Sequence, residues 1–248
     1  TQFASSAASD VYKRQVVHPP GAPIFLMVGR IFSFLAPSPE MVPVMMNLFS
    51  ALASSFTALF LFWTVTHFAR KVVMKSDEDY RSKGNIIAVM AAGAVGALTC
   101  GFMDSLWFSA VEAEVYALAM FFIGLIVWIA TRWERAADGP NADRWLILLA
   151  LMTGLSVGVH LLSLLALPAV GIMIYFKKFK PTVKGTVVTF FVSIGVLALI
   201  LFGFLDIFVR MAAVVERSFV NGMGMPFNSG TIFFCIVFIG ALAYGIHY

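Results

Sequence analysis

The chain has 248 residues, of which 60% are hydrophobic and 12% are charged. A soluble domain is about half apolar and about a quarter charged, so this composition excludes a single water-soluble core and indicates an integral membrane protein. The net charge of +4 is small, and the basic residues stand in short clusters between apolar runs, which argues against a nucleic-acid partner. Cys100 and Cys235 lie in apolar runs without the spacing of a metal site or a disulfide framework, so we expect neither a metal nor a cofactor.

Residues 1–15 differ from the remainder of the chain. The segment Thr1–Gln15 is polar, begins without Met and contains the string SSAASDVYKRQ, which resembles a translated sequencing adapter. It lacks the apolar core that follows a basic start in a signal peptide. We expect this segment to be non-native and loosely packed, and we expect residues 16–248 to form one transmembrane domain that is truncated at both ends.

The apolar runs that follow predict an all-α, polytopic bundle with about seven membrane-crossing helices, since each crossing needs about 20 apolar residues. Val16–Leu35 combines a Pro-rich turn with a short apolar helix that Arg30 and Pro37 interrupt, so we expect an interfacial or re-entrant helix there. The expected crossings lie within residues 42–68, 85–103, 115–131, 145–176 (two helices), 185–205 and 231–248.

The stretch Trp145–Phe176 carries no formal charge and has a length between one crossing and two. A single helix over this range would be about 48 Å long, against a hydrocarbon core of about 30 Å. Arg144 precedes the stretch, and Lys177, Lys178 and further lysines follow it, so the positive-inside rule places both ends in the cytoplasm. We therefore predict a hairpin of two short helices that turns near residues 158–162.

The other Lys and Arg residues agree with this orientation. The loops at residues 70–84 and 132–144 are basic, whereas 103–114 contains no Lys or Arg and 206–230 contains only Arg210 and Arg217. Because basic loops stay in the cytoplasm, we predict that the alternate loops face away from it.

Acidic residues gather in one of these non-cytoplasmic loops, within GFMDSLWFSAVEAEVYAL. On a continuous helix, at about 100° per residue, Glu112 and Tyr116 would share a face and Glu114 would point nearly opposite. One interpretation is that Asp104, Glu112 and Glu114 are surface carboxylates in a wet loop and that Tyr116 belongs to an interfacial aromatic belt. The other is a cavity-facing carboxylate that binds a sugar hydroxyl or accepts a proton.

Two further polar features lie in the expected non-cytoplasmic regions. His160 stands in the middle of the hairpin and is either a hydrogen-bonded structural residue or a ligand for an anion. His18, Pro19, Pro20 and Gly21 form a rigid, extended turn, because proline fixes φ and restrains the residue before it. We predict that this turn, Glu112 and His160 converge on one pocket, with His18 and Asp104 at its rim.

Four strings occur in order along the chain: VVHPPGAPIFLMVGRIFSFLAP, MNLFSALASSFTALFLFW, SLWFSAVEAEVYAL and GLSVGVHLLSLLALPA. Together they resemble a bacterial membrane-protein family, common in Bacteroidetes and long of unknown function, that is similar to protein O-mannosyltransferases. The resemblance implies an inverting glycosyltransferase of the GT-C class. Such an enzyme moves a sugar from a polyprenyl-phosphate donor to a protein or glycan acceptor, in a bacterium at the periplasmic face of the inner membrane.

The resemblance also implies a set of substrate-binding residues: His18, Pro19, Pro20, Asp104, Glu112, Tyr116 and His160. In the family, an acidic motif upstream of the HPPG turn is the candidate catalytic base. Thr1–Gln15 takes its place here, so the catalytic residue is unknown and we expect this chain to be inactive by itself. The alternatives are a transporter or flippase of lipid-linked sugars, which would predict internal repeats and broken helices at the bilayer midplane, and a non-catalytic membrane protein.

Overall fold

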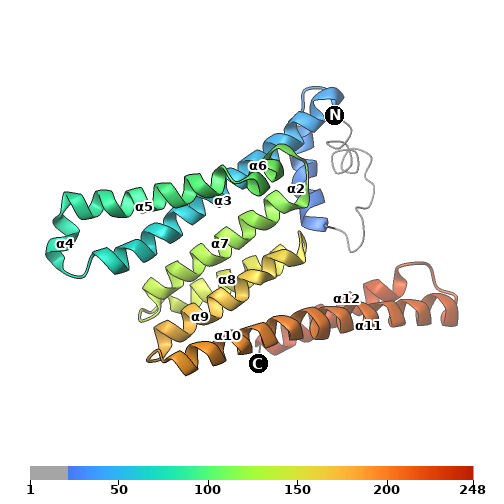
Figure 1. Cartoon of the computed structure of the whole chain (residues 1–248). Coiled ribbons are helices and arrows are strands. Elements are labelled where there is room, and N and C mark those ends of the chain that lie inside the picture. The colour runs from blue at the N-terminus through green and yellow to red at the C-terminus, as the bar shows by residue number, and fades with distance from the viewer. Residues whose placement is uncertain (1–21, 248) are drawn as a thin grey trace. The chain divides into compact units, whose positions relative to one another are not determined.

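The computed structural model describes residues 22–247, and every regular element in that range is a helix (Figure 1). The chain divides into two compact units, whose boundary falls between Phe190 and Phe191, inside a helix. Six helical stretches of the described part are long and apolar enough to cross a membrane, which confirms the all-α, polytopic architecture. These stretches are Pro39–Val73, Lys83–Gly101, Val115–Ala136, Leu161–Lys178, Val183–Gly222 and Ser229–His247.

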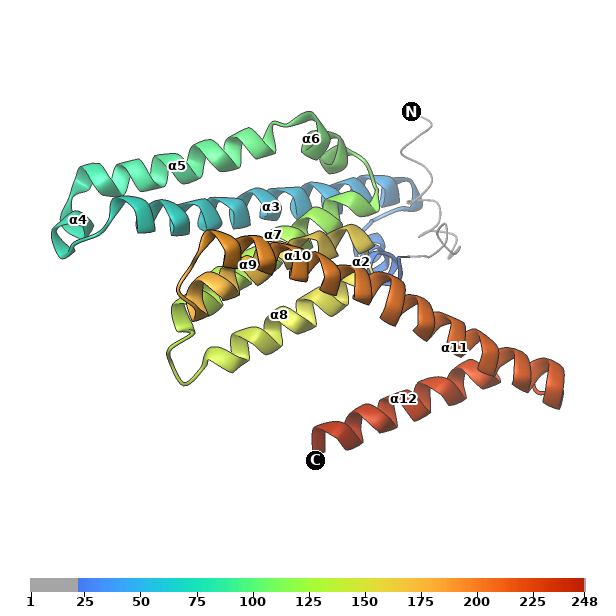
Figure 2. The ribbon, with the colours of Figure 1, turned by 60° about the horizontal axis from the view of Figure 1, so that its bottom comes forward.

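Unit 1 is built around one long central helix, α3, along which α5 and α7 pack, while α8 packs on α7 (Figures 1 and 2). The expected crossings 42–68, 85–103 and 115–131 correspond to α3, α5 and α7. In chain order the elements are α2 (Pro23–Phe34), η2 (Pro39–Met41), α3 (Val42–Val73), α4 (Asp77–Arg81), α5 (Lys83–Gly101), α6 (Asp104–Val111), α7 (Val115–Ala136), α8 (Ala142–Val157), η3 (Leu161–Ala166), α9 (Leu167–Lys178) and the first part of α10 (Val183–Ala198).

The core of unit 1 lies where α2, α3 and α7 meet. Buried side chains recur every three or four residues, as one face of a helix requires; they include Met46, Phe49 and Ala53 on α3 and Ala119, Phe122 and Ile126 on α7. The ring of Phe49 also contacts Phe25 and Phe32 of α2, with centroids 5.7 and 5.0 Å away. Much of the remaining apolar surface is exposed, for example Ile87 of α5 at 67%, which suits a helix that faces lipid.

Helix α2 is a short, apolar helix beside the bundle, as predicted, but Arg30 does not interrupt it. The helix continues to Phe34, as the high helix propensity of arginine permits. The Arg30 guanidinium lies 4.3 Å from the centroid of the Phe34 ring and donates to the Ser33 hydroxyl, 3.3 Å away. It ends three residues before Pro37, where a proline would remove a helical hydrogen bond.

The predicted hairpin is confirmed in residues 145–176. Helix α8 ends at Val157, His160 has extended backbone angles, and the chain resumes as η3 and then α9. Helix α8 has 16 residues, and it is the one expected crossing that is absent from the six long apolar stretches of the described part.

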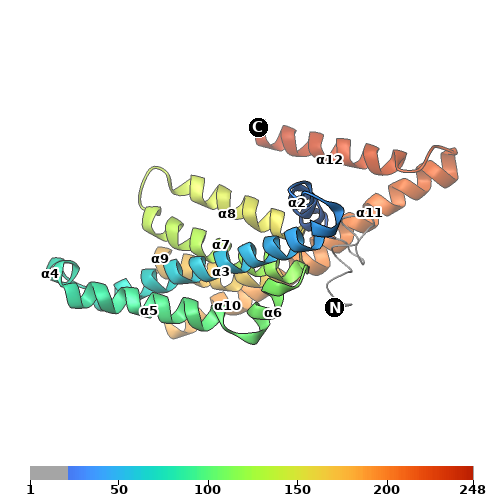
Figure 3. The ribbon, with the colours of Figure 1, turned by 90° about the horizontal axis from the view of Figure 1, so that it is seen from above.

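The two ends of unit 1 differ in charge. Helix α4, the α7–α8 loop and the α9–α10 loop lie together at one end, which we call the basic end (Figures 1 and 3). Helix α4 starts with a capping box between Ser76 and Asp79, and the N–H groups of Lys75 and Ser76 donate to Asp79 and hold the pKa of its carboxyl below the usual range. Helix α6 and the α8–α9 turn lie at the other end, which carries Asp104, Glu112 and His160 and which we call the opposite end.

Unit 2 is a helical hairpin that contradicts the predicted loop at residues 206–230. After α10 the chain continues through η4 (Leu199–Leu205), α11 (Asp206–Arg217) and η5 (Ser218–Gly222) before it turns into α12 (Ser229–His247). The charges that suggested a loop instead stabilise the helix, because Asp206 and Arg210 form an i,i+4 ion pair of 2.8 Å. Glu216 then caps α12 by accepting from the backbone N–H of Asn228 and Thr231, at 2.6 and 2.7 Å.

Candidate functional site

The acidic segment at the opposite end lies in a break between two helices. Helix α6 ends at Val111, and Glu112 and Glu114 both have extended backbone angles before α7 begins at Val115. The Glu112 N–H closes α6 by donating to Phe108 O at 3.1 Å, and the Glu114 N–H donates to Glu112 O at 2.9 Å. The prediction that Glu112 and Tyr116 share one helix face was therefore wrong, because no helix joins them. Both carboxylates are half-buried near the start of α7, where the helix dipole favours negative charge.

His160 lies in the turn between α8 and η3 and is partly buried. Its Nδ1 accepts a hydrogen bond from the Leu162 N–H at 3.1 Å, so the neutral ring carries its proton on Nε2. Among the described residues Nε2 has no hydrogen-bond partner. The bond to Leu162 supports a structural role for His160, and the same bond leaves an N–H donor on the other side of the ring.

Tyr116 connects the acidic segment with this turn. Its ring centroid lies 5.4 Å from that of His160, at an interplanar angle of 52°. One turn further along α7, Ala119 O accepts a hydrogen bond from the Ser163 hydroxyl at 3.3 Å, which fixes η3 against the first turns of α7. Two of the predicted site residues, Tyr116 and His160, are thus in contact, although 44 positions separate 116 from 160 in the sequence.

The start of α2 is joined to the same turn. The Ile24 N–H donates to Gly158 O at 2.9 Å, and Ala22 and Val159 are 3% and 1% exposed. A side chain at Gly158 would lie 2.5 Å from Ile24 Cγ1, so only glycine permits this approach. Ala22 directly follows the HPPG turn in the sequence.

Several predicted features stay predictions. His18, Pro19 and Pro20 lie outside the described residues, as does the expected non-native segment 1–15. Asp104 is exposed in the first turn of α6, and the convergence of Glu112 with His160 on one pocket has not been tested. We call the meeting point of the start of α2, the α6–α7 break and the α8–α9 turn the junction. Beside it lies a groove of about 310 Å³ whose lining is apolar and comes from α2, α3 and α7.

A polar cluster at the basic end was missed by the sequence analysis. His67 of α3 is 4% exposed, its Nε2 lies 2.7 Å from Glu134 Oε2, and Lys71 also donates to that carboxylate. Arg135 Nε donates to His67 Nδ1 at 2.9 Å, so the imidazole passes a hydrogen bond from Arg135 on to Glu134. The available signal was His67, a polar residue at the end of the apolar run 42–68, since such residues are costly in a membrane; Glu134 stands among the arginines of the basic loop 132–144 and gave no such signal.

The comparisons with known proteins agree with the resemblance of the four strings. A model of the N-terminal domain of protein O-mannosyl-transferase TMEM260 matches residues 6–183, more than half of the chain. The chain belongs to this family. The protein O-mannosyl-transferase TMEM260 of Mus musculus is 28% identical over 142 residues, which cover 57% of this chain and 18% of the mouse protein. The chain thus corresponds to less than a fifth of that relative, and no solved structure shows a significant match.

Membership in the TMEM260 N-terminal domain family confirms an O-mannosyltransferase-like protein. All three segments of the junction, namely the start of α2, the α6–α7 break and the α8–α9 turn, lie within the matched range. The expected bacterial source stays a prediction.

Proposed function

We propose that the full-length protein transfers a hexose, such as mannose, from a polyprenyl-phosphate donor to a hydroxyl group of a protein or glycan, as a GT-C enzyme. The observation that carries this proposal is the junction at the opposite end of unit 1. There the Tyr116–His160 contact and the Ile24–Gly158 hydrogen bond bring together three segments of the family domain.

The transfer reaction needs three protein groups: a base for the acceptor hydroxyl, a hydrogen-bond donor for the leaving phosphate and a group that binds the sugar. A base removes the proton of the acceptor hydroxyl, the acceptor oxygen forms a bond to the anomeric carbon, and the bond from that carbon to the phosphate oxygen breaks. The electron pair leaves with the polyprenyl phosphate, whose negative charge a hydrogen-bond donor stabilises. His160 is suited to that donor role, because its Nδ1 is already occupied and its proton lies on Nε2. Glu112 would bind a sugar hydroxyl, and the base would come from the acidic motif expected upstream of His18.

The distribution of charge supports an active site that faces away from the cytoplasm. The junction lies at the end of unit 1 opposite to the basic loops, which the positive-inside rule places in the cytoplasm (Figure 1). In a bacterium this side of the inner membrane is the periplasm, where lipid-linked sugar and acceptor would meet.

The test uses a full-length protein that contains this chain, in liposomes with a synthetic polyprenyl-phosphate mannose and a peptide acceptor. We expect Glu112→Gln and His160→Ala each to lower transfer at least about tenfold, since single groups of this kind contribute about 10² or more. Glu40→Gln is the matched control, because Glu40 is an exposed carboxylate between α2 and α3 at the same end. Full transfer by both site variants would contradict the proposal, and movement of the donor across the bilayer without transfer would favour a flippase.

A further inference from the structure

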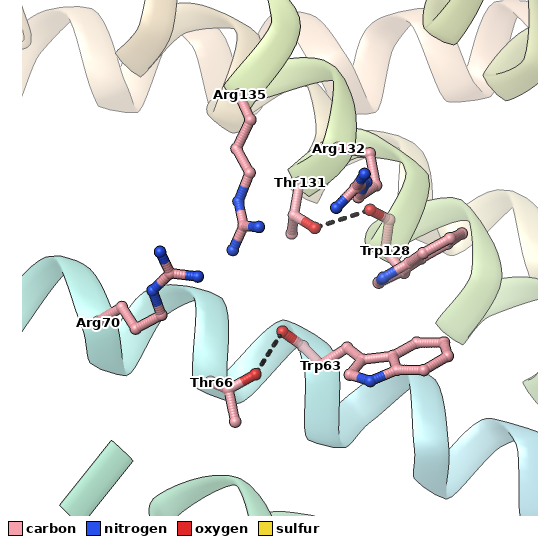
Figure 4. Close-up of a pocket in the computed structure, with 7 residues that line it drawn as sticks. All are labelled: Trp63, Thr66, Arg70, Trp128, Thr131, Arg132 and Arg135. Atoms are coloured by element: carbon pink, nitrogen blue, oxygen red, sulfur yellow. Dashed lines mark hydrogen bonds between the residues drawn. The ribbon is translucent and has the colours of Figure 1, made fainter. Parts of the chain in front are cut away.

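A second recess lies at the basic end of unit 1, far from the junction. It has a volume of about 370 Å³ and lies between the last turns of α3 and α7 (Figure 4). Helix α3 contributes Trp63, Thr66 and Arg70, and α7 contributes Trp128, Thr131, Arg132 and Arg135. We call it the arginine pocket. Three guanidinium groups line it, and none of its lining residues is acidic.

The pocket follows from the way in which the two helices pair. Helices α3 and α7 both run toward the basic end. Trp128, Thr131 and Arg135 of α7 each follow a residue of the same type on α3 by 65 positions, so like residues of the two helices line the recess in the same order. On each helix the three positions are spaced i, i+3 and i+7, so they form one stripe. The result is a recess with a tryptophan floor, a threonine layer and then Arg70 and Arg135, while Arg132 lies beside Trp128 (Figure 4). We call the three arginines together the arginine rim.

The tryptophan rings of the floor pack on each other, and the threonine hydroxyls of the middle layer are already hydrogen-bonded. The rings of Trp63 and Trp128 lie 5.4 Å apart at 34°. The hydroxyls of Thr66 and Thr131 donate to the carbonyls of their own helices, at 2.9 and 2.7 Å. The arginine rim therefore supplies the charge with which the pocket can attract a ligand.

Neutral groups hold the three arginines in place. Arg135 donates to the imidazole of His67, as described above. The Arg132 guanidinium lies 6.0 Å from the Trp128 ring and 5.4 Å from the Trp145 ring, and that of Arg70 lies 5.7 Å from the Tyr80 ring. The nearby carboxylate of Glu134 is shared between His67 and Lys71 and does not line the pocket. Among the described residues, neutral side chains thus contact all three guanidinium groups, and no acidic side chain that lines the pocket neutralises their positive charge.

Ordinary membrane-protein rules explain only part of this arrangement. Helix C-termini and the positive-inside rule both favour basic residues at this end. They do not require three guanidiniums around one recess, where like charges repel each other. Planar guanidiniums bind phosphate oxygens in pairs, and basic pockets between transmembrane helices at the cytoplasmic surface bind anionic lipid headgroups.

We propose that the arginine pocket binds the phosphate group of an anionic membrane lipid, at the end of the bundle opposite to the candidate site of sugar transfer. A lipid is favoured over a soluble phosphate because the pocket opens at the ends of two apolar helices and has a tryptophan floor, of which Trp63 is 39% exposed. The proposal does not depend on the enzymatic activity.

The experiment counts lipids bound to the full chain by native mass spectrometry after titration with phosphatidylglycerol or phosphatidylcholine. We expect one phosphatidylglycerol to be retained with at least a tenfold preference over phosphatidylcholine. Combined substitution R70Q, R132Q and R135Q should abolish this preference. The matched control, K178Q, K180Q and K184Q, removes the same charge from exposed positions at the same end and should retain it.

A second set of variants and two further outcomes complete the test of the arginine pocket. If the triple glutamine variant does not fold, R70K, R132K and R135K keeps the charge but loses the paired donors, and it should weaken the preference severalfold. Equal loss of preference in the arginine and control variants would overturn the proposal, since it would show a general charge effect. Protection against heat by inorganic phosphate alone, without any lipid preference, would support the phosphate site and overturn the lipid as its occupant.

Discussion

The close approach of α2 to the α8–α9 turn makes a quantitative prediction for Gly158→Ala. The added Cβ would lie 2.5 Å from Ile24 Cγ1 and 3.3 Å from Leu155 O. Gly158 has φ −72°, so alanine suffers no backbone strain there and the whole penalty comes from packing. Overpacking costs about 1–3 kcal/mol. The displaced Ile24 N–H also loses its bond to Gly158 O, which adds about 1 kcal/mol.

The assay is thermal unfolding of the purified chain in detergent, followed by its helical circular dichroism. A loss of about 2–4 kcal/mol corresponds to a fall of the midpoint by about 5–10 °C. Gly154→Ala is the matched control on the same helix, because nothing lies within 4 Å of a Cβ at that position. That variant should keep or raise the midpoint, since alanine is favoured over glycine inside a helix by about 0.5–1 kcal/mol.

A double substitution identifies the cause. Ile24→Ala removes the side chain that the new Cβ would meet, so Gly158→Ala should cost less in that background than in the wild type. Equal midpoints for Gly158→Ala and Gly154→Ala, or strictly additive effects of the Ile24 and Gly158 substitutions, would refute the proposed packing.

Three further predictions concern other parts of the chain. Glu134→Ala should destabilise the chain by about 1–3 kcal/mol, since it leaves the buried imidazole of His67 without its acceptor. Asp138→Ala, whose carboxylate is exposed, should leave the thermal midpoint nearly unchanged; similar midpoints would argue against the role of Glu134 as the partner of His67. With the native cysteines replaced, Ser105→Cys should react with an impermeant maleimide added outside intact cells, whereas Glu78→Cys should not, because the positive-inside rule places residues 70–84 in the cytoplasm. The reverse labelling pattern would contradict the predicted topology. Gly230→Ala should increase hydrogen exchange in the α11–α12 turn, because its Cβ would lie 2.6 Å from Glu216 Cα; exchange like that of wild type would count against this contact.

The crossings and the hairpin could be predicted because they depend on local properties of the sequence. Apolar length and flanking charge alone locate α3, α5 and α7, and they identify the break near His160. Helix α6 could not be found in this way, since it lies inside the predicted loop 103–114 and is too short for a crossing. Ala113, in the break that follows α6, is 3% exposed in the assembled core, and no local pattern predicts that burial.

The polar contacts needed information on tertiary structure. Asp206 and Arg210 suggested a loop because charges usually end a crossing, whereas their mutual pairing continues the helix. His67 and Glu134 come from different helices, and only the parallel register of α3 and α7 brings them together. The resemblance to a family placed Tyr116 and His160 in one set of substrate-binding residues, but no local pattern predicts their contact.

Helix α7 is a continuous rod that links the two ends of unit 1. It has 22 residues and is therefore about 33 Å long, close to the thickness of the hydrocarbon core. Its first turn bears Tyr116, and its last turns bear Arg132 and Arg135. An axial slide of this rod along α3 would misalign the paired tryptophans and at the same time carry Tyr116 past His160. The position of Tyr116 at one end of unit 1 and that of the arginine pocket at the other are therefore set by one and the same helix.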